Sequence, residues 1–406
     1  MVCSFPPEIS PGRLEFELSQ ALTNKGHRVE VVTAFPRRYL LRHALKHKGL
    51  FLYKEKMGSL KVTKMGPEFA DRDNLFSRGL EYFLDFILFS IGGLLSSKSD
   101  VILCSSPPMT IGLAGWFLAR IRRIPIVLRI GDIHPQALID LGLVKSKSMT
   151  FLLKTIERIL YQKVDHIILL SDKYKQDLIR KGTNPEKISV VSNWVDSEEI
   201  IRLEKVNTFR KDTKLSNEFL VTYAGTMSWP QDLETVIEAA SLVSSYPDIK
   251  FILAGDGPQK KPLENKAQTL GLQNLIFLPL QPREIYVNII QASDVCLVSL
   301  KKDFKTPAVP TKLLDIMACG RPVIANVPLE GDVPKIISVA KCGLWVEPQN
   351  SEDLCRVILS LRDNSKLREI MGINSRRYFN EHFSLESCMR SYERIFLQEV
   401  DKTLST

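Results

Sequence analysis

The chain has 406 residues, of which 44% are hydrophobic and 25% are charged, a globular profile that excludes a disordered or low-complexity chain. Because a single core stops growing at about 250–300 residues, this length predicts two domains. Seven scattered cysteines without a CxxC pair exclude a disulfide framework, and eight of the nine excess positive charges lie within residues 1–200.

The first half of the chain alternates short β-rich runs with helical runs. An unusually short first strand covers residues 1–4, and helical patterns cover residues 14–25 and 150–163. Further strands are predicted at residues 27–33, 100–105, 124–130, 166–170 and 188–192. Strands that alternate with helices predict a parallel sheet covered by helices on both faces.

Two places in this half carry residues suited to a ligand. Gly12 and Arg13 follow a proline-rich loop and open the first helix, where backbone N–H groups and an arginine favour an anion. Asp132 and His134 follow the strand at residues 124–130, at the sheet edge where α/β proteins place their sites. We predict Asp132 and His134 as catalytic residues; the alternative is a helix cap and a turn.

One apolar run, at residues 79–95, is a candidate for membrane contact. It is shorter than the roughly 20 residues of a spanning helix, and Glu81 and Asp85 interrupt it. We predict that this apolar run forms a core helix; the second choice is a helix that lies on a membrane surface. With the basic cluster of residues 37–48, it predicts a cytoplasmic protein in peripheral, salt-sensitive contact with an anionic membrane face. The alternative is charge that serves solubility.

Neither a metal nor another cofactor is predicted. Asp71 and Asp73 form a DxD, but they precede an apolar run instead of ending a strand, so we interpret them as loop charge. His43 and His47 are four residues apart without a carboxylate nearby, which disfavours a metal pair.

A second α/β domain follows a polar, charge-rich stretch at residues 196–218. Its strands are predicted at residues 219–224, 250–253, 275–278, 295–299, 322–325 and 344–346. The last helical pattern begins at residue 385 and has no strand after it, which is typical of a tail that crosses back to the first domain. We therefore predict an N-terminal domain of residues 1–197 with the helix of residues 385–406, and a second domain of residues 215–384.

Two glycine turns in the second domain each follow a strand and open a helix. One contains Gly225 and Thr226, and the other reads Gly255-Asp256-Gly257. Glycines let a backbone approach a ligand closely, and helix N-termini favour phosphate. Both turns therefore predict binding of a nucleotide diphosphate in one crevice at the strand ends. The alternative is a pair of tight turns between strand and helix.

A third motif contains Pro310, Thr311, Lys312 and Asp315. Proline and threonine are typical of a helix start. The helix dipole disfavours a cation in the first turn, so Lys312 indicates that an anion binds there. Asp315 shares its helix face and can accept hydrogen bonds from sugar hydroxyls. The alternative is an ordinary ion pair between Lys312 and Asp315.

Five elements, FPPEISPG, DIHPQ, YAGTMSWPQDLE, LAGDGP and VPTKLLDIMACGRPV, stand in the order seen in the family 4 glycosyltransferases, and the chain resembles that family over nearly its whole length. It is most similar to the branch that builds surface polysaccharides and lipid-linked glycans. The resemblance implies two Rossmann-like domains facing a cleft, the GT-B fold, with the acceptor in the first domain and a nucleotide sugar in the second. It also implies that Asp315 binds the ribose, Lys312 lies near the diphosphate and Gly12 faces the phosphates.

The chain departs from the family pattern at two places. The family has a second carboxylate where this chain has Pro307, and it often has arginine and lysine where this chain has Trp229 and Gln231. Gln231 is still predicted to contact the donor. These departures leave open which sugar the protein transfers and how it is held.

The predicted function is metal-independent transfer of a sugar of the hexose type from a nucleotide-sugar donor to a glycan or polyprenyl-diphosphate-linked acceptor, with retention of configuration. One alternative is a sugar-nucleotide epimerase of the same architecture, which hydrolysis of the nucleotide sugar without an acceptor would support. The other is a basic nucleic-acid-binding protein, which steeply salt-dependent oligonucleotide binding would indicate. The sequence shows no motif of aromatic residues that would stack on bases and no motif of a helix that would enter a nucleic-acid groove, so a nucleic-acid partner is not supported.

Overall fold

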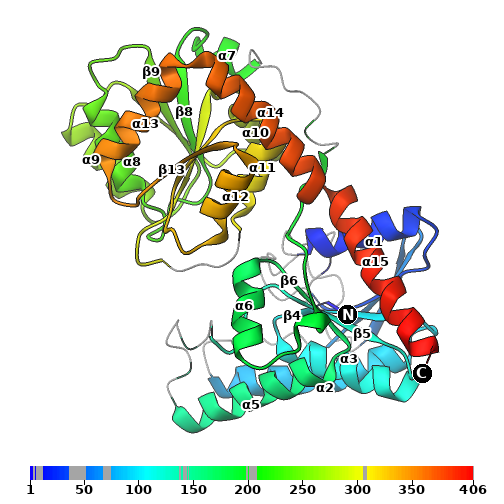
Figure 1. Ribbon diagram of the computed structural model, residues 1–406. Helices are drawn as coiled ribbons and strands as arrows, with labels where there is room; N and C mark the ends of the chain where they lie inside the picture. Colours follow the sequence, from blue (N-terminus) through cyan, green and yellow to red (C-terminus); the bar gives the residue numbers. More distant parts are fainter. Residues whose placement is uncertain are drawn as a thin grey trace. The chain divides into compact units, whose positions relative to one another are not determined.

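The computed structural model describes residues 1–2, 5, 12–35, 52–66, 75–136, 139, 144, 146–197, 200, 208–304 and 309–405, and for residues 75–82 the backbone alone. The basic cluster of residues 37–48, the DxD of residues 71–73 and Pro307 lie outside these ranges. Two compact units are present: unit 1 comprises Met1–Ser192 and Cys388–Thr406, and unit 2 comprises Asn193–Ser387 (Figure 1).

Unit 1 contains two sheets that the start of the chain connects. One has the order β1 (Glu30–Ala34), β3 (Leu60–Met65), β2 (Leu52–Met57), and the other has the order β4 (Ile102–Ser106), β5 (Ile126–Ile130), β6 (His166–Leu169), β7 (Ile188–Val190). The N–H of Val2 donates to Val32 O at 3.0 Å, and the N–H of Ser105 donates to Met1 O at 3.1 Å. The short first strand therefore lies between β1 and β4.

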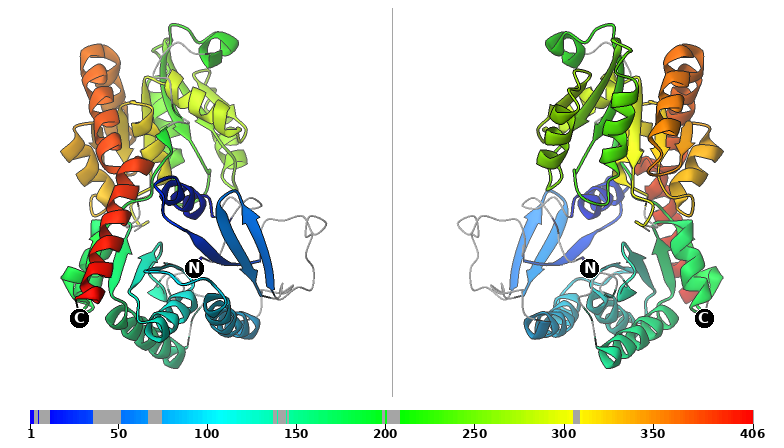
Figure 2. Two further views of the ribbon diagram at one scale, coloured as in Figure 1. Left: turned by 90° about the vertical axis from the view of Figure 1, so that its right-hand side faces the viewer. Right: turned by 90° about the vertical axis from the view of Figure 1, so that its left-hand side faces the viewer.

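Helices cover both faces of the unit 1 sheets. Its helices before residue 192 are α1 (Arg13–Asn24), α2 (Leu75–Leu94), α3 (Met109–Arg122), α5 (Lys147–Lys163), α6 (Asp172–Arg180) and the 3-10 turn η1 (Pro185–Lys187). Val32 of β1 packs in the core that α2, α3 and α5 cover, whereas its neighbour Val31 packs with Phe16 of α1. Successive strand residues point to opposite faces, so α1 lies on the other side of the sheet from α2, α3 and α5 (Figure 2).

The C-terminal helix α15 (Leu385–Leu404) packs on unit 1, as the sequence predicted. Glu399 of α15 lies 3.2 Å from the buried ring of His166 in β6. Glu393 pairs with Lys25 at 2.8 Å at the end of α1. These pairs hold α15 against β6 and α1.

Unit 2 is a six-stranded parallel sheet with the order β10 (Leu275–Leu278), β9 (Ile249–Ala254), β8 (Phe219–Ala224), β11 (Val295–Ser299), β12 (Val323–Asn326), β13 (Gly343–Val346). Counted along the chain, this is the doubly wound order 3-2-1-4-5-6, which reverses between β8 and β11. Its helices are α7 (Thr208–Thr213), α8 (Leu233–Leu242), α9 (Lys260–Thr269), α10 (Arg283–Ala292), α11 (Thr311–Ala318), α12 (Asp332–Ala340), α13 (Ser351–Asp363) and α14 (Ser365–His382). The carboxyl ends of β8 and β11 are therefore where a ligand is expected.

The predicted α/β fold class is confirmed, but the hairpin of β2 and β3 was not predicted. Its strands are rich in lysine, and β2 lies at the sheet edge with half-exposed residues, so they lack the apolar run of a central strand. Among the described residues, no helix has both the length and the apolar character needed to cross a bilayer.

Candidate functional site

The loops that follow β8 and β9 touch each other closely. Gly225, Gly255 and Gly257 have φ values of +146°, +152° and +149°, a region that glycine adopts readily. A Cβ on Gly255 would lie 1.9 Å from the carbonyl oxygen of Gly225, and one on Gly257 would lie 2.3 Å from that of Met227. Glycine is required here because two backbone segments approach each other.

The N–H groups of these three glycines bind protein acceptors. Gly225 donates to Ala254 O at 2.9 Å and Gly255 donates to Leu278 O at 3.1 Å. Gly257 donates to the side chain of the preceding residue, Oδ1 of Asp256, at 2.8 Å. These amides are therefore bonded within the loops of the unliganded protein, and glycine is needed here for loop packing; contact of the two turns with a diphosphate stays a prediction.

Helix α11 begins where the third motif predicts. Pro310 is its N-cap and Thr311 its first residue, and Gly320 follows its end with a φ of +63°. Lys312 therefore stands in the first turn, where the helix dipole disfavours a cation.

The side chain of Lys312 reaches the end of β8. Its Nζ donates to Tyr223 OH at 2.6 Å and to Gln231 Oε1 at 3.1 Å, and it lies 4.0 Å from the centroid of the Tyr223 ring. Tyr223 OH donates in turn to the carbonyl of the exposed Thr226 at 2.6 Å. All of these partners are neutral, and burial lowers the pKa of Lys312 to about 7. An anion at this position would restore the charged form.

Asp315 contacts α10 instead of Lys312. Its carboxylate accepts from Arg283 at 2.7 Å and from Tyr286 OH at 3.0 Å, and it is buried. Burial, followed by the charge of Asp315, raises the pKa of Tyr286 well above its usual value. Lys312 and Asp315 thus contact different partners. The ion pair between them, which was the alternative interpretation of the motif, does not form. A ribose bound to Asp315 would share that carboxylate with Arg283 and Tyr286.

A buried polar cluster supports the loop that carries Gln231. The Asp232 carboxylate accepts from Asn326 Nδ2 at 3.1 Å and from the N–H of Gln349 at 2.9 Å, and Ser299 Oγ donates to the Asp232 carbonyl at 2.9 Å. Sequence reasoning missed this cluster. Its only local signal is a polar residue at the end of each apolar strand, Ser299 in β11 and Asn326 in β12.

Trp229 lies on the same loop and is 55% exposed. Lys301 Nζ stands 5.0 Å from the centroid of its ring, and the N–H of Lys301 donates to Pro230 O at 2.9 Å. These contacts join the loop after β8 to the loop after β11, across the point where the strand order reverses.

In unit 1, the structure brings Asp132 and His134 together with Tyr174 of α6. Burial, followed by the charge of the nearby Asp132 carboxylate, raises the pKa of Tyr174. Burial lowers the pKa of His134, and the charge of Asp132 only partly opposes this. The imidazole of His134 is therefore neutral at pH 7 and can accept a proton.

Gly12 and Arg13 stand at the start of α1. Gly12 is buried with an extended φ of −179°, so its backbone conformation does not itself demand glycine. Arg13 already pairs with Glu17 one turn along the helix. Of the predicted site residues, these two and the pair Asp132 and His134 belong to unit 1, and all the others belong to unit 2.

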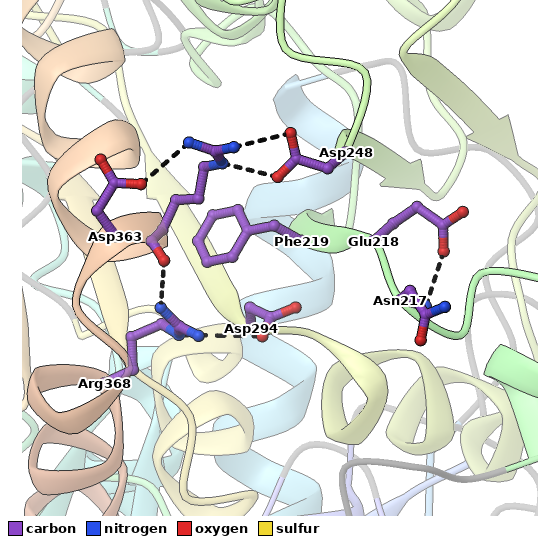
Figure 3. A pocket seen from close by; sticks show the side chains of 8 residues that line it. Asn217, Glu218, Phe219, Asp248, Asp294, Asp363 and Arg368 are labelled. Atoms are coloured by element: carbon purple, nitrogen blue, oxygen red, sulfur yellow. Dashed lines mark hydrogen bonds and ion pairs between the residues drawn. The ribbon is translucent and has the colours of Figure 1, made fainter.

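A cavity of about 330 Å³ opens at the other end of the unit 2 sheet (Figure 3). It is lined by Phe219, the first residue of β8, and by Asp248 and Asp294, which precede β9 and β11. Arg362 bridges both oxygens of Asp248 at 2.7 and 3.0 Å. Ligands of such sheets bind at the carboxyl ends of the strands, so we do not assign the donor to this cavity.

Both units match models of glycosyltransferase families. The model described as Glycosyltransferase Family 4 matches residues 12–199, and that described as Glycosyl transferases group 1 matches residues 205–378. WcaI of Escherichia coli strain K12, named for glycosyl transfer in colanic acid biosynthesis, is 27% identical over 90% of this chain and 93% of its own. WbjE of Pseudomonas aeruginosa, named as a glycosyltransferase, is 24% identical over 79% of this chain and 82% of its own.

Solved structures share the fold at low identity. HepE of Anabaena in complex with UDP has a TM-score of 0.68 and 14% identity, with 98% of both chains covered. A glycosyltransferase from Rickettsia africae has a TM-score of 0.70 and 16% identity, again with 98% of both chains covered. The chain belongs to the family 4 glycosyltransferases and has their GT-B fold.

Proposed function

We propose that this glycosyltransferase transfers a sugar of the hexose type from a nucleotide-sugar donor to a glycan or polyprenyl-diphosphate-linked acceptor, with retention of anomeric configuration. Lys312 carries the proposal. It is a half-buried lysine with neutral partners, Tyr223 and Gln231, at the point where the strand order reverses. A diphosphate beside it would supply the opposite charge and raise its pKa.

The donor nucleotide is proposed to lie along α11. Asp315, one turn beyond Lys312, would accept hydrogen bonds from the ribose hydroxyls, and Gln231 and Thr226 would border the diphosphate. HepE was solved with UDP, which makes uridine diphosphate the first nucleotide to test. The name of WcaI, a relative over most of both chains, favours a surface glycan as the product.

The residues of unit 1 are proposed to act on the acceptor. In the transfer, the bond between the anomeric carbon and the diphosphate oxygen breaks, and the acceptor oxygen bonds that carbon on the same face. His134, whose pKa burial lowers, can take the proton of the acceptor hydroxyl. Asp132, which lies near Tyr174, would orient that hydroxyl. Lys312 would neutralise the departing diphosphate, so we propose that no metal ion or other cofactor is needed.

The proposal is tested by incubating the protein with nucleotide sugars of different bases and with glycan or lipid-linked acceptors. We expect one nucleoside diphosphate to be released only when donor and acceptor are both present, with the product anomer matching the donor. The same nucleotide should stabilise the protein by about 2.7 kcal/mol at about 100 times its dissociation constant. Release of the nucleoside diphosphate without an acceptor would support the epimerase alternative. The names of the relatives, which are glycosyltransferases, do not support that alternative. Stabilisation by none of the nucleotides would refute the proposal.

A further inference from the structure

Three helices of unit 1 form one continuous layer. Figure 1 and Figure 2 show α2, α3 and α5 side by side on one side of the sheets. They approach at glycines: a Cβ on Gly93 of α2 would lie 2.5 Å from Leu118 of α3, and one on Gly112 of α3 would lie 3.0 Å from Leu160 of α5. Their inner residues belong to one core, so their outer residues form one surface, which we call the α2–α3–α5 face.

The α2–α3–α5 face is apolar to an unusual degree. Of the thirteen large apolar side chains exposed in the described part of unit 1, ten lie on these helices or directly after α2. They include Phe83, Ile91, Phe117, Ile121, Phe151 and Ile159. Phe151 is 73% exposed, and it shares a side of α5 with Ile159, eight residues further on. Single exposed apolar residues are ordinary, but a concentration on one face marks an interaction surface.

The exposed charged side chains of the described parts of these three helices are cationic, and one of them, Arg120, pairs with Asp165 just after α5. Arg120 of α3 and Lys147, Lys154, Arg158 and Lys163 of α5 are exposed or border the apolar residues. In the described part of these three helices the carboxylates are Asp85 and Glu157, and both are buried. Among the described residues of its own helices, the exposed face thus combines apolar and cationic side chains without an exposed carboxylate.

We infer that the α2–α3–α5 face binds the surface of an anionic lipid bilayer. Apolar side chains such as Phe151 would enter the boundary between headgroups and acyl chains, while Lys147, Lys154 and Arg158 would contact lipid phosphates. A second copy of the chain fits less well, because a twofold interface brings identical cationic patches together. The sequence pointed to residues 79–95 and to the basic cluster of residues 37–48, which lies outside the described residues; α3 and α5 supply most of the surface described here.

Vesicle flotation of the full chain tests the inference, and it needs neither donor nor acceptor. The wild type should bind vesicles that contain phosphatidylglycerol more tightly than phosphatidylcholine vesicles, and binding should fall at high salt. The triple variant Lys147→Glu, Lys154→Glu, Arg158→Glu should bind anionic vesicles about a hundredfold more weakly, since each basic residue contributes about 1 kcal/mol. The variant Phe151→Glu, Ile159→Glu should lose more than tenfold.

Matched controls lie on unit 2. Lys211→Glu, Lys261→Glu, Lys366→Glu makes the same change of charge at exposed sites, and Leu280→Glu, Ile373→Glu replaces two exposed apolar residues. The controls should bind vesicles like the wild type. All variants should keep the circular dichroism of the wild type and its affinity for nucleoside diphosphate, which separates this inference from the proposed function.

Three results would overturn the inference. The first is a wild type that binds no anionic vesicle at low salt. The second is an equal loss of binding in the face variants and the controls. The third is a wild type that sediments as a dimer without lipid while the Phe151→Glu, Ile159→Glu variant sediments as a monomer, because the face would then be an interface between two copies.

Discussion

Binding of nucleoside diphosphate is predicted to depend on pH through Lys312. With a pKa of about 7, roughly half of the lysine is charged at pH 7 and about one hundredth at pH 9. If the diphosphate binds the charged form, its affinity falls about fiftyfold between these values, or about 2.3 kcal/mol. Phosphate groups titrate near pH 6, so this window isolates the lysine.

Calorimetry at pH 7, 8 and 9 checks this prediction. Binding at pH 8 should take up about 0.9 proton, because the anion restores the charged lysine. This uptake is seen as different apparent binding enthalpies in buffers that differ in ionisation enthalpy. Lys312→Arg should bind with little pH dependence, since guanidinium stays charged, and Lys312→Met should bind weakly at every pH. Lys260→Met, at the start of α9, should keep the wild-type slope.

The stability of the unliganded protein gives an independent check. The pKa of Lys312 is lower in the folded protein than its ordinary value of 10.5, so the unfolded chain binds more protons between about pH 7 and 10.5. Stability should therefore rise with pH across this window, and Lys312→Met should remove that part of the slope. Equal affinity at pH 7 and 9 without proton uptake would refute the assignment of Lys312 to the diphosphate.

Three further predictions concern the same site. Asp315→Ala should weaken nucleoside diphosphate binding tenfold or more by calorimetry, because hydrogen bonds to a charged group contribute about 1.5–3 kcal/mol each; a folded variant that binds like the wild type would contradict the ribose role. Gly255→Ala should lower the melting temperature far more than Gly271→Ala, because Gly255 has a φ of +152° and its Cβ would meet Gly225 O at 1.9 Å, while Gly271 has a φ of +65° and open space around it; equal melting temperatures would reject the packing argument. Transfer should continue in excess EDTA, and activity lost with chelator and restored by manganese would return Asp71 and Asp73 to consideration.

The motifs at the strand ends could be predicted because each is local in the sequence. β8, β10 and β11 have the predicted bounds because each is a continuous apolar run; β8 and β11 are buried throughout, whereas β10 is a half-buried edge strand. Pro310 and Thr311 predicted the start of α11, and with it the position of Lys312 in the first turn. Because a cation is unfavourable in the first turn of a helix, the sequence alone indicated that an anion binds near Lys312.

The partners of these residues could not be predicted, because they are distant in the sequence. Tyr223 lies 89 positions from Lys312, and Arg283 lies 32 positions from Asp315. Helical spacing placed Lys312 and Asp315 on one face, but it could not show that α10 holds one and β8 the other. The contact between the two glycine turns could not be predicted for a related reason, since a glycine needed for contact between two loops has the same local sequence as one that approaches a ligand.

In the unliganded site, the neutral side chain of Gln231 gives Lys312 no opposite charge. The variant Gln231→Glu tests the consequence of adding that charge. The change keeps the side-chain shape and places a carboxylate where Oε1 now lies, 3.1 Å from Lys312 Nζ. The pair should raise the pKa of Lys312 and the melting temperature of the unliganded protein near pH 8.

The same carboxylate would compete with and repel a diphosphate. Binding of nucleoside diphosphate to Gln231→Glu should therefore weaken at least tenfold, and proton uptake on binding at pH 8 should disappear. Gln231→Met, which removes the acceptor without adding charge, should not raise the melting temperature. Higher stability with unchanged nucleotide affinity would mean that the diphosphate binds away from Lys312, because opposite effects on stability and binding are expected only when one cation serves both.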